Sequence, residues 1–252
     1  MSMIIIIGFI FFITGLIPIY LGAKYYKFRK IIVSTPTSKI WDLHKGLVEI
    51  YGEVVPSEKG TMISPITQKE CVYYKYKIQE YRSSGKTGHY VTISQGEEHR
   101  LFYLQDLTGL VLVDSKDAKI EIFNKYKITT GLFKNIPISA IPFLEKNNIK
   151  YKFPFFGNKN MRFEEQTIKP YSKAYLLGTV KNRFNADMIP IKPGEAEGLI
   201  QKCEGDAVYY ISDATEEEII RKYKTRAYIG FFFGILAFLV GTAIILSSIL
   251  IP

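Results

Sequence analysis

The chain has 252 residues and a formal net charge of +9 at pH 7, and 47% of its residues are hydrophobic. Its only two cysteines, Cys71 and Cys203, exclude a disulfide-rich secreted domain and favour two small buried side chains. The positive charge would suit nucleic acid. Much of it, however, lies beside two long apolar segments, where basic side chains meet anionic lipid head groups. We therefore expect membrane lipids, and no nucleic acid, among the partners.

The first apolar segment, residues 3–22, reads MIIIIGFIFFITGLIPIYLG and contains no charged side chain. A secretory signal would need a positive side chain before the apolar run and small residues at a cleavage site. No basic residue precedes this run, and bulky Tyr20, Tyr25 and Tyr26 lie at its exit. We predict an uncleaved transmembrane helix.

The second apolar segment, residues 228–251, reads YIGFFFGILAFLVGTAIILSSILI and also lacks charge. At roughly 1.5 Å per helical residue it spans about 36 Å, which exceeds the ~30 Å hydrocarbon core of a bilayer. Asp213 and Glu216 fit an N-terminal helix cap, so we expect this helix to begin near Ala214 and to run into the membrane. The sequence stops at Pro252, and we expect no folded domain beyond this span.

Basic side chains flank both apolar segments on the side of the middle region, residues 23–227. Because lysine and arginine near a span resist translocation, this pattern predicts a cytoplasmic middle domain with both termini outside. A long domain can nevertheless cross a membrane regardless of flanking charge. The residues expected to bind lipid head groups are Lys24, Lys27, Arg29, Lys30, Arg221, Lys222, Lys224 and Arg226.

The middle region begins with strand patterns. Residues 47–55 (LVEIYGEVV) alternate apolar and polar side chains, and residues 71–81 (CVYYKYKIQEY) do so more clearly. In the second segment we expect Val72, Tyr74, Tyr76 and Ile78 to face a core, and Tyr73, Lys75, Lys77 and Gln79 to face outward. A turn over residues 82–88 and a returning strand over residues 90–94 complete a predicted hairpin.

Further short strands are predicted at intervals of ten residues or so, and the grouping indicates a mainly β domain. We expect a β-barrel or sandwich-like domain between two transmembrane helices. The remaining predicted strands are 101–104, 109–113, 119–123, 162–168, 174–181, 188–191 and 208–211.

Residues 129–157 interrupt this pattern with a predicted short helix over 139–147 and an aromatic run that ends at Gly157. The insertion either packs into the core or forms an exposed apolar patch that contacts the membrane or a partner. Together with the basic-aromatic strand face, it supplies the candidate partner-binding residues. These are Tyr73, Lys75, Lys77, Leu132, Phe133, Phe143, Phe153, Phe155 and Phe156.

No motif predicts a catalytic residue, a metal site or a cofactor. The Gly85-Lys86-Thr87 string lacks the upstream glycine of a phosphate-binding loop, where Glu80 stands instead. Three scattered histidines, His44, His89 and His99, do not form a helical metal pair. Asp106 and Asp114 flank a turn and a strand end, where aspartate typically bonds to the local backbone.

The order of the motifs resembles a known family. A membrane span is followed by HKGLVEIYGEVV, SPITQKECVYYKYKIQEY, LFYLQDLTGLVLV, MRFEEQTIKPYSKAYLLGTV and AVYYISDATEEEII, and then by a second span. This arrangement resembles the GIDE or BAM ("beside a membrane") domain, and it is similar to the middle part of the mitochondrial ubiquitin ligases MULAN and MAPL. The resemblance implies a membrane-embedded β domain that recognises a substrate or partner.

In those ligases, the activity lies in a zinc-binding RING after the second span, and a RING needs eight cysteine or histidine ligands. The two cysteines and three histidines present here cannot supply them, so we expect no ligase chemistry from this sequence. We predict an interaction or scaffolding module, in a prokaryotic source, with a LemA-type membrane protein as a candidate partner. The alternatives are a ubiquitin-type E3 ligase, a hydrolase using Cys71 or His99, and a lipid- or anion-binding module.

Overall fold

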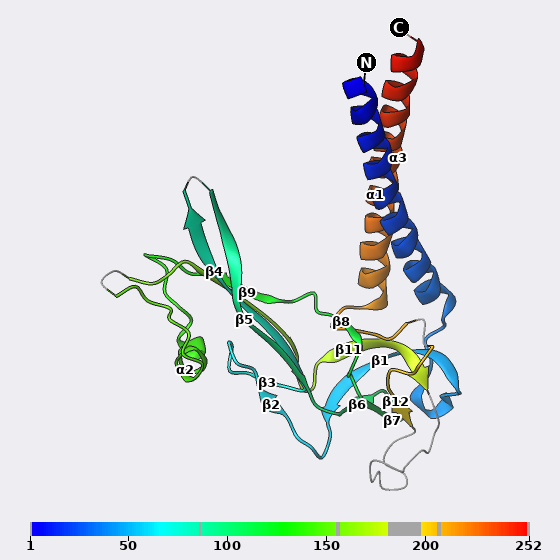
Figure 1. Cartoon of the computed structure of the whole chain (residues 1–252). Helices are drawn as coiled ribbons and strands as arrows, with labels where there is room; N and C mark the ends of the chain where they lie inside the picture. The colour runs from blue at the N-terminus through cyan, green and yellow to red at the C-terminus, as the bar shows by residue number, and fades with distance from the viewer. Residues whose placement is uncertain (1, 86, 155–156, 181–197, 206–207, 251–252) are drawn as a thin grey trace. The chain divides into compact units, whose positions relative to one another are not determined.

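The computed structural model describes residues 2–85, 87–154, 157–180, 198–205 and 208–250. It divides into two compact units, one formed by Met1–Pro36 with Thr215–Pro252 and the other by Thr37–Ala214. Figure 1 shows the elements of both, coloured along the chain. The strand predicted over residues 188–191 lies outside the described residues.

The first unit is a pair of long antiparallel helices, α1 (Ser2–Ser34) and α3 (Glu216–Leu250), which lie side by side (Figure 1). Both are long and apolar enough to cross a membrane. Each extends roughly 12 residues, or about 18 Å, beyond its apolar segment into basic sequence. The helix predicted to begin near Ala214 is confirmed. α1 continues to Ser34, past the basic residues that follow its apolar segment.

Glycines allow the two helices to approach closely. A methyl group added at Gly15 would lie 2.9 Å from the carbonyl oxygen of Gly234 and 2.8 Å from the backbone nitrogen of Phe238. Gly8 and Gly22 of α1 are equally crowded by α3. Small residues at such contacts are the usual means by which membrane helices pack, because burial from water contributes no driving force inside lipid.

The cap of α3 differs from the prediction by two residues. Thr215 and Glu218 form the reciprocal box: the Thr215 backbone N–H donates to the Glu218 carboxylate at 3.0 Å, and the Glu218 N–H donates to the Thr215 hydroxyl at 3.4 Å. Asp213 instead accepts hydrogen bonds from the backbone N–H groups of Phe123 and Asn124. Two overlapping D-x-x-E and T-x-x-E patterns in the sequence made both caps plausible.

The second unit contains a closed ring of five strands. β1 (Gly46–Pro56) pairs with β11 (Lys173–Val180) along its first part and with β6 (Phe102–Gln105) along its last part. β6 continues to β7 (Leu110–Val113), which pairs in parallel with β12 (Leu199–Ile200). β12 then returns to β11 and closes the ring. The mainly β fold is therefore confirmed, and of the two predicted forms the structure has the barrel.

The inward-facing side chains of this ring form the main core. They include Val48 and Ile50 of β1, Leu104 of β6, Val111 of β7 and Leu176 of β11. β13 (Tyr210–Ser212) pairs with β11 and with β8 (Lys119–Glu121) and extends the sheet beyond the ring. A short helix, η1 (Ile40–Asp42), adds Ile40 to the same core.

A second sheet has the order β5, β4, β10, β9, with β5 at Thr87–His99, β4 at Tyr73–Ser84, β10 at Met161–Ile168 and β9 at Tyr126–Thr129. One face packs against the predicted insertion helix, found as η2 (Ile138–Ala140) and α2 (Ile141–Lys146). A small ladder joins β2 (Met62–Ile63) to β3 (Glu70–Cys71). The turn predicted over residues 82–88 is much shorter, because both strands continue toward Gly85.

The predicted burial of the strand at residues 71–81 needs one correction. Ile78 is buried and Lys75 is exposed, as expected, but Tyr73 is only 2% exposed and belongs to the barrel core. β4 starts at Tyr73 after a bend at Val72, so this end of the strand lies against the barrel rather than in solvent.

Candidate functional site

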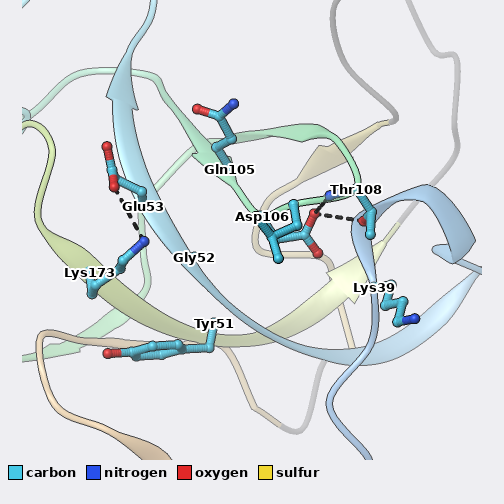
Figure 2. A pocket seen from close by; sticks show the side chains of 9 residues that line it. Lys39, Tyr51, Gly52, Glu53, Gln105, Asp106, Thr108 and Lys173 are labelled. Atoms are coloured by element: carbon cyan, nitrogen blue, oxygen red, sulfur yellow. Dashed lines mark hydrogen bonds and ion pairs between the residues drawn. The ribbon is translucent and has the colours of Figure 1, made fainter.

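A cavity of about 630 Å³ opens on the barrel unit and is shown in Figure 2. It lies where the β6–β7 turn meets β1 and β11. Gly52 permits this meeting, because a side chain there would collide with the backbone of Gln105. The lining residues are Lys39, Tyr51, Gly52, Glu53, Gln105, Asp106, Leu107, Thr108 and Lys173.

The carboxylate of Asp106 fixes the turn at the edge of this cavity. One oxygen accepts hydrogen bonds from the Thr108 N–H and hydroxyl, both at 2.6 Å, and from the Gly109 N–H at 3.0 Å. The other oxygen accepts from the Ile40 N–H at 3.0 Å. Burial disfavours the charged form, but the hydrogen bonds from Thr108, Ile40 and Gly109 outweigh it and hold the pKa of Asp106 below its usual value. Asp106 therefore acts as a structural acceptor, which confirms the role predicted for it.

The fixed turn holds Leu107 in solvent. This side chain is fully exposed, and Tyr51 nearby is also exposed. Trp41, another exposed aromatic residue, is joined to the turn by a hydrogen bond from its backbone N–H to the Thr108 hydroxyl at 3.2 Å. The cavity thus combines apolar and aromatic side chains on a rigid frame.

Charged side chains complete the rim. The Nζ of Lys173 lies 3.2 Å from a carboxylate oxygen of Glu53, and Figure 2 shows this pair on the side of the cavity away from Lys39. Both members are partly exposed, so the pair contributes little to stability. It places two opposite charges side by side at the rim of the cavity.

Replacing Asp106 with alanine is expected to lower the free energy of unfolding by about 1–2 kcal/mol at neutral pH, because three backbone N–H groups lose their acceptor. The folded-state pKa is lowered, so the contribution of Asp106 is present above the unfolded-state pKa of about 4 and is lost as the pH falls through the folded value. The difference between wild type and variant should therefore shrink in acid. Urea unfolding at several pH values checks this, and the exposed Glu58→Ala is the matched control.

Cys71, one of the two predicted hydrolase residues, is held as an unreactive thiol. The other, His99, ends β5, and its Nε2 lies 3.9 Å from a carboxylate oxygen of Asp114. Cys71 is buried, and its thiol donates to the Met62 carbonyl at 3.5 Å. Burial, followed by the charges of Glu165 and Glu98, raises the pKa of Cys71 to about 12, so the nucleophilic thiolate is disfavoured at neutral pH. Cys203, the other cysteine, is only half-buried.

The predicted strand face of Tyr73, Lys75 and Lys77 is less available than expected. The Tyr73 hydroxyl donates to one oxygen of Glu97 at 2.9 Å, and the Nζ of Lys75 lies 2.8 Å from the other oxygen. Tyr73 is buried and Lys75 is neutralised by its partner, while Lys77 is half-buried. Partner contact at the two lysines stays a prediction.

The predicted insertion contains both alternatives, core packing and exposure. Phe143 is half-buried and contacts the Tyr76 ring at 5.0 Å between centroids, and Leu144 is fully buried. Leu132, Phe133 and Phe153 are exposed instead. Phe155 and Phe156 lie outside the described residues.

The predicted head-group residues lie on the last turns of α1 and the first turns of α3. Six of them are exposed, and Arg29 and Lys222 are half-buried. The guanidinium of Arg226 lies 5.7 Å from the Tyr25 ring centroid on the neighbouring helix, a cation–π contact between α3 and α1. Binding of lipid head groups by these residues stays a prediction.

Sequence reasoning missed the barrel cavity, because its residues are distant in the chain. One signal was available: Leu107 occupies a turn, Asp106-Leu107-Thr108-Gly109, where polar residues are the rule. An apolar side chain at such a position marks a contact site more specifically than the same residue in a strand.

The comparisons with known proteins give one finding. The family model of GIDE, described as E3 ubiquitin ligase, matches residues 73–246. No curated protein and no solved structure matches significantly. The match covers β4 through most of α3 and so includes parts of both units. Because it extends over more than half of the 252 residues, the chain belongs to the GIDE family, and its two apolar helices fit a membrane protein.

Proposed function

We propose that the protein is a membrane-anchored interaction module whose barrel cavity binds a partner polypeptide and holds it at the membrane. The observation that carries the proposal is Leu107, a fully exposed apolar side chain on a turn that Asp106 holds rigid. Such a residue costs little further conformational entropy when it is buried by a partner.

The composition of the cavity supports a polypeptide ligand. Interfaces are enriched in aromatic residues, and their binding energy is concentrated in a few anchors surrounded by a polar rim. Here Leu107 and Tyr51 are the anchors, and Lys39 with the Glu53–Lys173 pair forms the rim.

Ligase chemistry is not included in this proposal. A RING would hold two zinc ions through cysteine and histidine side chains. Among the residues that the structure describes, no three histidine, cysteine, aspartate or glutamate side chains lie together so that they could hold a metal ion. The described residues therefore do not fit a zinc site, and we derive no transfer step.

The partner is proposed to be a protein of the same membrane, with a LemA-type protein as the first candidate from the family resemblance. The basic residues at the helix ends favour a cytoplasmic location for residues 37–214, because such residues resist translocation. In that location the module would recruit its partner from the cytoplasmic face.

Site-specific photocrosslinking of the full chain in native membranes tests the proposal. A photoreactive phenylalanine analogue at position 107 is expected to give one discrete adduct. The same analogue at Ile63, an exposed residue away from the cavity, is expected to give none. Equal adducts at both positions, or none at position 107, would contradict the proposal.

Once the adduct has identified the partner, its affinity can be measured. Leu107→Asp is expected to weaken binding by roughly thirtyfold or more, as for a central anchor, and Ile63→Asp by less than roughly twofold. Cys71→Ser should leave binding unchanged. Loss of function in Cys71→Ser with the fold intact would favour an enzyme instead.

A further inference from the structure

We infer that a second membrane-contacting site lies on the β domain itself, beyond the proposed function, and that it binds the surface of an anionic phospholipid bilayer. The site, called the turn patch below, consists of three exposed apolar side chains and two lysines on two adjoining turns. Its members are Leu132, Phe133, Lys134, Lys152 and Phe153.

The first turn is built to expose its apex. Gly131 and Lys134 exchange backbone hydrogen bonds, with the Gly131 N–H donating at 3.4 Å and the Lys134 N–H donating at 3.0 Å. The buried Thr130 hydroxyl donates to the Lys159 carbonyl at 3.1 Å and fixes the base of the turn. The two residues at the apex are Leu132, which is exposed, and Phe133, which is 93% exposed.

The second turn is joined to the first. The Phe153 N–H donates to the Gly157 carbonyl at 3.1 Å, and the Lys159 N–H donates to the Tyr151 carbonyl at 2.9 Å. The side-chain amide of Asn158 donates to the Lys134 carbonyl at 3.3 Å and connects the turns directly. Phe153 therefore projects beside the first turn from a backbone that is itself held in place.

The segment of the chain that carries the turn patch is strongly basic. Residues 125–159 contain seven lysines and one acidic residue, Glu145. Lys127 lies 3.0 Å from Glu164, and Lys159 lies 2.6 Å from Glu80. The other five lysines have no carboxylate within ion-pair distance in the described part of the chain: Lys125, Lys134, Lys146, Lys150 and Lys152. An anionic surface is the complementary partner for exposed apolar side chains that are flanked by Lys134 and Lys152.

A cavity of about 500 Å³ beside the apex favours a lipid head group at the site. Its polar lining includes Thr129, Lys134 and Asn160, and its aromatic lining is Tyr81, Tyr90 and Phe133. The rings of Tyr81 and Tyr90 meet edge to face at 5.3 Å between centroids. Tyrosine is enriched at the level of lipid head groups because its ring is apolar and its hydroxyl is polar.

A cation also faces this aromatic pair. The guanidinium carbon of Arg162 lies 3.8 Å from the centroid of the Tyr90 ring, and the buried Nε of Arg162 has no hydrogen-bond partner among the described residues. Lys134 in the lining and Arg162 beside Tyr90 each add a positive charge at this cavity, which suits a lipid phosphate.

Vesicle binding by the full chain tests this inference. The protein is placed in nanodiscs of phosphatidylcholine, and its flotation with added vesicles is measured. We expect binding to phosphatidylglycerol-containing vesicles and much weaker binding to phosphatidylcholine vesicles. The double variant Lys134→Gln, Lys152→Gln should bind the anionic vesicles roughly thirtyfold more weakly, at about fivefold per lysine. Phe133→Ala should lose on the order of tenfold.

Matched variants in the β2–β3 region test whether vesicle binding depends on any exposed lysine or apolar side chain, wherever it lies. Lys69→Gln and Ile63→Ala remove one exposed lysine and one exposed isoleucine away from the patch, and each should change binding by less than roughly twofold. Equal losses in these controls, or equal binding to both vesicle types, would overturn the inference.

Tryptophan fluorescence identifies the contact directly. In a Trp41→Phe background, the tryptophan of Phe133→Trp should be quenched by brominated phosphatidylglycerol vesicles, and the tryptophan of Ile63→Trp should not. Absence of quenching at position 133 while the vesicles still bind would assign binding to the basic helix ends and would overturn the inference. Photocrosslinking from position 133 to a protein alone, without lipid quenching, would show that the patch is a protein contact.

Discussion

Replacing Glu165 with alanine is expected to lower the free energy of unfolding by about 3–5 kcal/mol. The Glu165 side chain lies on β10 and the residue is only 1% exposed. Its carboxylate accepts hydrogen bonds from the N–H groups of Ile66 at 2.7 Å and Thr67 at 3.0 Å, and from the hydroxyls of Ser64 at 3.2 Å and Thr67. Alanine would leave these donors buried without an acceptor.

Glu164→Ala is the matched control, because the neighbouring carboxylate is partly exposed and its partner is Lys127 at 3.0 Å. We expect a loss of less than about 1 kcal/mol there. Urea unfolding of the full chain in detergent, followed by circular dichroism, measures both. Similar losses in the two variants would show that the segment at residues 64–67 does not depend on Glu165.

The segment held by Glu165 also shows what sequence can predict. β10 was predicted almost to its ends, and alternation places Glu165 on the same face as Phe163, the core face. A carboxylate on a core face signals a buried acceptor. Its donors, however, lie about 100 residues earlier in the chain, between the strands predicted over residues 47–55 and 71–81. The interaction could not be predicted, because the donors and the acceptor are far apart in the sequence and a local pattern carries no information about such pairs.

The same dependence on contacts between distant residues explains why closure of the barrel was not predicted. The long strands β1 and β11 follow from alternation, but ring closure depends on β12, which has only two residues, Leu199 and Ile200. A two-residue strand leaves no periodic signal. Sequence therefore predicted a barrel or a sandwich, and a parallel pairing between β7 and β12 decided between them.

The residues that line the cavity could not be predicted from the sequence. Tyr51 reads as an outward strand position, Leu107 as part of a turn and Lys173 as a strand start. Nothing in their local patterns indicates that β1, β6 and β11 bring them together. By contrast, Leu132, Phe133 and Phe153 of the turn patch were named as candidate contact residues from the sequence, as part of an insertion for which core packing and exposure both stayed open.

Replacing Gly15 with leucine is expected to separate the two long helices. The added side chain would enter space occupied by the Gly234 carbonyl and by the backbone of Phe238, neither of which is a flexible side-chain end. Overpacking of this kind costs roughly 1–3 kcal/mol, and in lipid no burial from water compensates for it. Gly234→Leu should have the same effect, because its side chain would meet the Gly15 carbonyl.

Thiol crosslinking in membranes measures the separation. Cysteines replacing Phe12 and Phe238, whose rings lie 4.6 Å apart between centroids, should be joined readily by a short crosslinker in a background of Cys71→Ser and Cys203→Ser. Gly15→Leu should slow this reaction by roughly tenfold or more. Ala23→Leu, at an exposed position of α1, should not. If Gly15→Leu crosslinks at the wild-type rate, the two helices are held together by their connection through the β domain in the chain, and close packing at Gly15 is not required.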